Sequence, residues 1–199
     1  MVAWADSDLL IVGHGSTRRA DATRATEELA ATLRARALFQ RVDTAYWKQA
    51  PTLESVAFTA PVTYVLPSFA GEGFFTNTRI PEVLGLDGPV TPLPDDRRVA
   101  YCRPPVAHPR TADLLRDRLE GLLAAHGHDP REIAVLLIAH GSRRAKDSGR
   151  TAQVLARDLA PHFGEVHALF LEQAPEATTW DRVVGRPTVV SVPLLMGEG

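Results

Sequence analysis

The chain has 199 residues, of which 45% are apolar and 23% charged, and its 22 Lys and Arg against 24 Asp and Glu give a formal net charge of −2. This composition is typical of a soluble globular protein, which excludes disordered and fibrous classes, and without a basic excess it argues against a general nucleic-acid binder. No apolar run approaches the roughly 20 residues of a membrane helix, and no signal peptide is evident. We therefore expect a cytoplasmic protein that contacts neither nucleic acid nor membrane.

Short apolar runs alternate with helical patterns along the whole chain. In the first part, strands are predicted at residues 8–12, 42–47, 61–66 and 98–103, and helices at 21–38, 52–60, 79–84 and 110–126. In the second part, strands are predicted at residues 133–138, 166–171 and 188–192, and helices at 147–163 and 177–184. Alternating strands and helices indicate an α/β fold with parallel sheets covered by helices.

The second part of the chain repeats the first. Residues 9–16, LLIVGHGS, are echoed by residues 135–142, VLLIAHGS, so the two histidines are 126 positions apart. The Gln-Ala-Pro segment at 49–51 returns 124 positions later, and the Gly-Glu-Gly segment at 71–73 returns 126 positions later. The distance between matching segments thus changes from 126 to 124 positions and back to 126, with identical residues before and after the change. Such a pattern indicates a duplication. We expect two domains, residues 1–127 and 128–199.

The second copy is shorter than the first. Gly199 falls opposite Gly73, so the second copy lacks counterparts of residues 74–126. A doubly wound sheet without that portion would have an open strand edge and uncovered apolar surface. We therefore expect the second domain to be incomplete at its C-terminus, and to be completed by a further segment or by a partner chain, such as the second copy in a homodimer.

Both His-Gly-Ser segments directly follow a predicted strand. Ligands of open parallel sheets bind beyond the carboxyl ends of the strands, which makes His14 and His140 candidate functional residues. Ser16 and Ser142 lie near helix starts, where a hydroxyl can cap free N–H groups. The alternative is a tight turn with a capping serine and a buried histidine, and the presence of histidine in both copies favours the functional interpretation.

Three sequence elements, in order and in two copies, resemble the class II chelatases of the sirohydrochlorin cobaltochelatase and ferrochelatase family in a tandem-duplicated form. They are the strand ending in His-Gly-Ser, the segment FLEQAP at 170–175 and the segment VPLLMG at 192–197. The resemblance covers essentially the whole chain. It implies two flavodoxin-like domains with four-stranded parallel sheets that insert Co²⁺ or Fe²⁺ into sirohydrochlorin, on the way to cobalamin or sirohaem. The metal ion is then a substrate, and no organic cofactor is implied.

The two copies differ in how many of that family's catalytic and metal-binding residues they contain. Its first histidine corresponds to His14 and His140, and its glutamate corresponds to Glu172 in the second copy but to Lys48 in the first. Its second histidine corresponds to Phe75 in the first copy and falls beyond the end of the second. The resemblance therefore implies that the second copy is catalytic, with His140 as metal ligand and proton acceptor and Glu172 as ligand or proton relay. His14 stays a candidate for the same roles.

Sirohydrochlorin carries eight carboxylates, so its pocket should offer cations and helix N-termini. Arginine forks bind carboxylates bidentately, and helix starts add a partial positive charge. The substrate-binding candidates are Arg18, Arg19, Arg143 and Arg144, which follow the two loops into helix starts, together with Ser16 and Ser142. Ordinary solvated arginines at a helix start are an equally weighted alternative.

Two other functions compete with the chelatase. A histidine phosphatase would carry Arg-His-Gly, but Gly13 and Ala139 precede the two histidines, which counts strongly against it. A non-catalytic protein that binds a metal ion or a tetrapyrrole is favoured by Lys48 and Phe75 in the first copy. Absorbance separates these alternatives, because metallation changes the tetrapyrrole spectrum, binding alone changes it less, and phosphate-ester hydrolysis does not change it.

Overall fold

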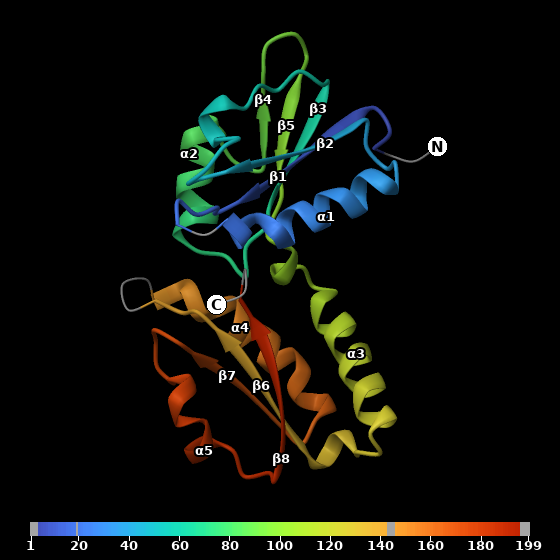
Figure 1. Ribbon diagram of the computed structural model, residues 1–199, viewed down its shortest axis with the longest axis vertical. Helices are drawn as coiled ribbons and strands as arrows, with labels where there is room; N and C mark the ends of the chain where they lie inside the picture. The colour runs from blue at the N-terminus through green and yellow to red at the C-terminus, as the bar shows by residue number, and fades with distance from the viewer. Residues whose placement is uncertain (1–3, 19, 143–145, 196–199) are drawn as a thin grey trace. The chain divides into compact units, whose positions relative to one another are not determined.

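The computed structural model describes residues 4–18, 20–142 and 146–195. The described chain forms two compact units (Figure 1). Unit 1 contains residues 4–69 and 74–105, and unit 2 contains residues 70–73 and 106–195. Within the described residues, no helix combines the length and hydropathy that crossing a bilayer requires.

Unit 1 is built on a five-stranded sheet with the order β2-β1-β3-β5-β4. Its strands are β1 (Ser7–Gly13), β2 (Arg41–Tyr46), β3 (Val62–Pro67), β4 (Val90–Pro92) and β5 (Arg98–Tyr101). The four strands that the sequence predicted are parallel, as expected. The additional strand, β4, pairs antiparallel with β5. It was missed because it is three residues long and belongs to a hairpin whose turn places Asp95 and Asp96 at φ values of 61° and 57°.

Side chains alternate across β1, so unit 1 has an apolar layer on each face of its sheet. Leu9 and Ile11 pack with Ala30 of helix α1 (Arg24–Ala35) on one face. Leu10 and Val12 lie on the other face, which is covered by residues from the loop after β2 and from helix α2 (Ile80–Leu84). The predicted helix near residues 79–84 is thus confirmed.

The helix predicted at residues 52–60 is wrong. Only Leu53–Ser55 form a helical turn, of the 3-10 type, and the chain is extended from Val56 onward. Val56 and Phe58 alternate along this extended segment and pack against the sheet. Because the segment is short and β-branched, tertiary packing decides its conformation rather than helix propensity.

Unit 2 repeats the central part of this arrangement. Its strands β6 (Ile133–Ala139), β7 (Glu165–Phe170) and β8 (Thr188–Leu194) are parallel in the order β7-β6-β8, which matches β2-β1-β3 of unit 1. Its helices are α3 (Thr111–Ala125), α4 (Arg150–Leu159) and α5 (Trp180–Val183). In place of the two four-stranded sheets that the family resemblance implied, the described residues form one sheet of five strands and one of three.

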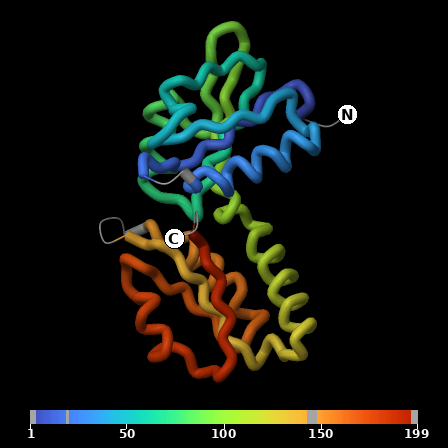
Figure 2. The backbone as a smooth tube through the Cα atoms, viewed as in Figure 1, coloured from blue at the N-terminus to red at the C-terminus, as the bar shows by residue number. Residues whose placement is uncertain are grey.

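Helix α3 belongs to unit 2, although the sequence predicts it as the last helix of the first domain. Its buried Leu119 and Leu123 share an apolar cluster with Val135 of β6 and Leu155 of α4. The backbone trace in Figure 2 lets the reader follow residues 106–127 into this unit. The observed units therefore divide after Pro105, whereas the repeat alone suggested a division after Gly127.

Candidate active site

In both units the histidine loop is tied to the loop that follows the neighbouring strand. In unit 2, the backbone N–H of Glu172 donates a hydrogen bond to the carbonyl oxygen of His140 at 2.9 Å. In unit 1, the N–H of Lys48 donates to the carbonyl oxygen of His14 at 3.0 Å. Because these hydrogen bonds continue the parallel pairing beyond the strand ends, the residue after the second strand is held beside the histidine.

In each unit, a glutamine side chain forms a hydrogen bond to the backbone of the histidine loop. The side-chain oxygen Oε1 of Gln49 accepts a hydrogen bond from the backbone N–H of Ser16 at 2.9 Å. In unit 2, Oε1 of Gln173 accepts from the N–H of Ser142 at 3.3 Å and from the hydroxyl of Ser148 at 3.1 Å. Sequence reasoning used these glutamines only to align the copies. Their presence in both copies was the signal that they hold the loop.

Glycine is required between the histidine and the serine. Gly15 and Gly141 have φ values of +64° and +70°, a region that side-chain-bearing residues rarely adopt. A Cβ atom at Gly141 would lie 2.8 Å from Cβ of Gln173 and 3.0 Å from Cβ of Phe170. The loop thus makes its turn in close contact with the end of the neighbouring strand.

A tyrosine supports the loop of unit 1. A Cβ atom at Gly13 would lie 3.0 Å from the ring of Tyr46, so the ring packs closely against the backbone there. The hydroxyl of Tyr46 donates a hydrogen bond to Glu27. Burial, together with the nearby Glu27 carboxylate, raises the pKa of Tyr46 to about 12, so the phenol stays protonated and remains a donor. In unit 2 the equivalent ring is Phe170, which is fully buried.

The histidine and glutamate predicted for unit 2 lie next to each other. Nε2 of His140 is 3.7 Å from Oε1 of Glu172, and the two side chains are 65% and 56% exposed. At this exposure their direct attraction contributes little to stability. Two ligands on one ion at about 2.1 Å each lie at most about 4.2 Å apart, so the pair can bind a single divalent metal ion. Within the described residues, no cluster of three His, Cys, Asp or Glu side chains suited to a metal ion is present.

Unit 1 has different chemistry at the same place. The ring nitrogen Nδ1 of His14 lies 2.9 Å from the carbonyl oxygen of Gly15, and its ring meets Phe75 edge to face with centroids 5.0 Å apart. Lys48 stands where unit 2 has Glu172. A lysine repels a metal ion, and a phenyl ring offers it no ligand. His14 therefore lacks the carboxylate neighbour that His140 has.

The substrate-binding candidates are only partly described. Arg18 is exposed, and its backbone N–H donates to the hydroxyl of Ser16 at 3.1 Å, so this hydroxyl caps the turn as the sequence suggested. Ser142 is half-buried beside Gln173. Arg19, Arg143 and Arg144 lie outside the described residues.

Comparison with known proteins places the chain in a family. The family model described as CbiX matches residues 8–122, which is more than half of the chain. The chain belongs to the CbiX family.

Its relatives agree with this assignment. A probable sirohydrochlorin cobaltochelatase of Halobacterium salinarum is 28% identical over 211 residues, covering 96% of this chain and 72% of the relative. A multi-domain protein of Deinococcus radiodurans, described as structurally similar to chelatases, matches 96% of this chain with 31% identity and a TM-score of 0.77, but this chain spans only 44% of that protein. A structure described as CbiX, the terminal enzyme of siroheme biosynthesis in denitrifying bacteria, matches with 27% identity and a TM-score of 0.72 over 94% of this chain and 79% of that one. The prediction of a class II metal chelatase fold and enzyme family is confirmed.

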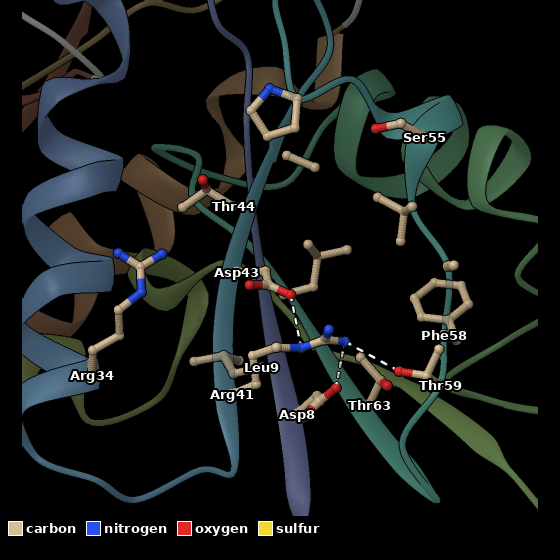
Figure 3. Close-up of a pocket in the computed structure, with 15 residues that line it drawn as sticks. Asp8, Leu9, Arg34, Arg41, Asp43, Thr44, Ser55, Phe58, Thr59 and Thr63 are labelled. Atoms are coloured by element: carbon tan, nitrogen blue, oxygen red, sulfur yellow. Dashed lines mark hydrogen bonds and ion pairs between the residues drawn. The ribbon is translucent and has the colours of Figure 1, made fainter.

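This CbiX-family chain also contains a cavity that the sequence did not predict. It has a volume of about 450 Å³ and lies near the amino ends of β1, β2 and β3, at the opposite end of this sheet from the His14 loop (Figure 3). Arg41 crosses it, with Nη2 at 2.8 Å from Oδ2 of Asp8 and Nε at 3.0 Å from Oδ2 of Asp43. Nη2 of Arg41 also donates to the hydroxyl of Thr59 at 3.3 Å. The polar groups that line the cavity are thus paired with one another. We interpret these pairs as structural contacts rather than as a ligand site.

Thr63 in this cavity provides a stability test. Within the described residues, Thr63 Oγ1 is the one buried side-chain oxygen or nitrogen without a hydrogen-bond partner. The equivalent residue of the second copy is Val189. Removing an unsatisfied buried hydroxyl is favourable, so Thr63→Val is expected to raise the free energy of unfolding by about 1 kcal/mol, measured by urea denaturation. A loss of stability instead would show that the hydroxyl is hydrogen-bonded in solution.

Proposed function

We propose that this chain inserts a divalent metal ion, Co²⁺ or Fe²⁺, into sirohydrochlorin, with unit 2 as the catalytic half. The observation that carries the proposal is the 3.7 Å approach of His140 Nε2 to Glu172 Oε1 at the carboxyl ends of adjacent parallel strands. Imidazole and carboxylate are ligands that first-row divalent metals accept. The relative named as a probable sirohydrochlorin cobaltochelatase supports this choice of substrate, and so does the structure described as the terminal enzyme of siroheme biosynthesis.

The reaction requires both metal delivery and proton removal. As the divalent ion enters the macrocycle, two pyrrole N–H protons must leave, so the charge of the macrocycle is unchanged. Neutral imidazole can bind the ion or accept a proton, and a positioned base of this kind contributes to the rate. We assign His140 as metal ligand and proton acceptor, and Glu172 as second ligand or proton relay. His14 has a secondary role, because Lys48 replaces its carboxylate neighbour.

The carboxylates of the macrocycle need cationic partners. Arg18 is exposed beside the loop of unit 1, where its guanidinium is accessible to an anionic substrate. We assign the same role to Arg19, Arg143 and Arg144 from their sequence positions, with the serines Ser16 and Ser142 shaping the loops. Bidentate arginine contacts give both attraction and orientation to carboxylates.

Anaerobic metallation of sirohydrochlorin tests the proposal. The protein is mixed with metal-free sirohydrochlorin and Co²⁺ or Fe²⁺, and the absorbance spectrum is followed against a protein-free control. We expect the spectrum of the metallated product to form faster with the protein than without it. A change in the macrocycle spectrum on binding, with no increase in the metallation rate, would instead establish the second candidate, a non-catalytic metal- or tetrapyrrole-binding protein. Lys48 and Phe75 in unit 1 favour that candidate.

A further inference from the structure

One glutamine side chain of unit 2 joins the two loops that carry the proposed metal ligands. Gln173 directly follows Glu172, in the loop after β7. Its side-chain oxygen Oε1 accepts hydrogen bonds from the backbone N–H of Ser142 at 3.3 Å and from the hydroxyl of Ser148 at 3.1 Å. Because Ser142 lies just after His140 in the chain, this oxygen ties the loop of the imidazole to the loop of the carboxylate.

The side chain of Gln173 is held in a narrow space between two glycines. A Cβ atom at Gly141 would lie 2.8 Å from Cβ of Gln173, and a Cβ atom at Gly149, which is buried, would lie 2.8 Å from its Nε2. The backbone on either side therefore leaves the glutamine little room to change its conformation. A side chain that is locked by packing fixes the groups that it binds more precisely than a mobile one does.

The equivalent glutamine of unit 1 has fewer partners available. Oε1 of Gln49 accepts a hydrogen bond from the N–H of Ser16 at 2.9 Å. The counterpart of Ser148 in the first copy is Ala22, so the hydroxyl that donates to Gln173 has no equivalent there. The glutamine with two donors to its oxygen thus belongs to the copy that contains the histidine and carboxylate pair.

We propose that Gln173 is the positioning residue of the metal site, and that it sets the separation of His140 and Glu172 at which both side chains bind one divalent ion. This inference rests on the proposed function, which assigns those two side chains to the metal ion. An amide oxygen has two lone pairs, and the two hydrogen bonds use both of them. Gln173 therefore acts on the ion through the loop of His140 and not as a ligand.

Replacing Gln173 with leucine tests the proposal, because it removes both hydrogen bonds and keeps a side chain of similar size. The affinity for Co²⁺ alone is expected to fall about tenfold, the lower end of the range for partners that orient metal ligands, and the metallation rate should fall with it. The visible absorption bands of bound Co²⁺ should shift, because they report the geometry of its ligands. Gln173→Glu should restore the affinity, the rate and the bands, since a carboxylate oxygen accepts the same two hydrogen bonds.

Two other glutamines supply matched controls. Gln49→Leu removes the equivalent side chain from the histidine loop of unit 1. It should lower the stability in urea denaturation about as much as Gln173→Leu does, but weaken Co²⁺ binding far less. Gln153→Leu makes the same change at an exposed position on α4 of unit 2, and should leave Co²⁺ binding and metallation unchanged.

Unchanged Co²⁺ affinity in Gln173→Leu, a loss that Gln173→Glu does not restore, or equal weakening in Gln49→Leu would overturn the positioning role, while metallation by the wild type would keep the chelatase proposal standing. If Gln173→Leu does not fold, Ser148→Ala replaces it, because it removes one of the two hydrogen bonds. Co²⁺ binding should then weaken about threefold, and no weakening would overturn the proposal. Wild-type protein that fails to metallate sirohydrochlorin, but shows the expected loss and recovery of Co²⁺ affinity, would support the positioning role and refute the chelatase proposal.

Discussion

Replacing His140 with alanine is expected to lower the rate of metal insertion by about 100-fold or more, the range over which a positioned acid or base contributes to catalysis. The substitution removes a metal ligand and a proton acceptor together. Both side chains of the His140–Glu172 pair are more than half exposed, so the variant should fold normally. The measurement is the initial rate of sirohydrochlorin metallation, with circular dichroism to confirm folding.

His14→Ala is the matched control for this prediction. It removes the same side chain from the equivalent loop of unit 1, where the neighbours are Lys48 and Phe75. We expect a much smaller loss of rate than for His140→Ala. Glu172→Gln provides a second comparison, because it keeps the shape of the side chain and removes its charge, which should weaken Co²⁺ binding. If His14→Ala abolished metallation while His140→Ala did not, the catalytic assignment would move to unit 1.

Gly141→Ala is expected to destabilise unit 2 by about 2–4 kcal/mol, the range of substitutions that combine steric overlap with a strained backbone. The backbone at Gly141 has a φ of +70°, and the new Cβ would lie 2.8 Å from Cβ of Gln173. Relief of this overlap must displace the loop that carries His140, so the metallation rate should fall as well. Urea denaturation and the metallation assay measure the two effects.

Gly127→Ala isolates the backbone contribution. Gly127 lies at the end of α3 in the same unit and has nearly the same φ, +71°, but no atom lies within 4 Å of its would-be Cβ. Only the cost of a left-handed alanine should appear there, about 1 kcal/mol. Equal losses for the two variants would show that the histidine loop relaxes freely, contrary to the tight packing that we describe.

Local sequence patterns predicted the buried strands, because a run of apolar residues is itself evidence for a strand that is covered on both faces. The run Leu9 to Val12 is a strand because consecutive apolar side chains must cover both faces of a buried sheet, and the repeat predicted the same for unit 2. The sequence did not predict β4, because it is only three residues long, or the extended segment after Leu53, because that segment is held by packing against the sheet. The packing of α3 was also missed, since its amphipathic pattern shows that one face is buried but not against which sheet.

The candidate site was predicted to a similar extent. The resemblance to the chelatase family named Glu172 together with His140, and the two residues lie close together because the carboxyl ends of neighbouring parallel strands meet at one edge of a sheet. The repeat marked Gln173 as a residue present in both copies, but its hydrogen bond to the N–H of Ser142 becomes evident only when the loops are folded. The ring contacts of Phe75 were hidden for the same reason, because they join residues from three separate loops.

Helix α3 belongs to the first copy by its sequence position but to unit 2 by its packing. The repeated unit of sequence ends after this helix, yet its Leu119 and Leu123 complete the apolar cluster that includes β6. A recombinant fragment cut at the repeat boundary, beginning at residue 128, would lack Leu119 and Leu123 and leave the rest of this cluster without them, whereas one beginning at Val106 would keep them. Because one hydrophobic cluster crosses the junction between the two copies, unit 2 needs residues from both of them in order to bury its apolar surface.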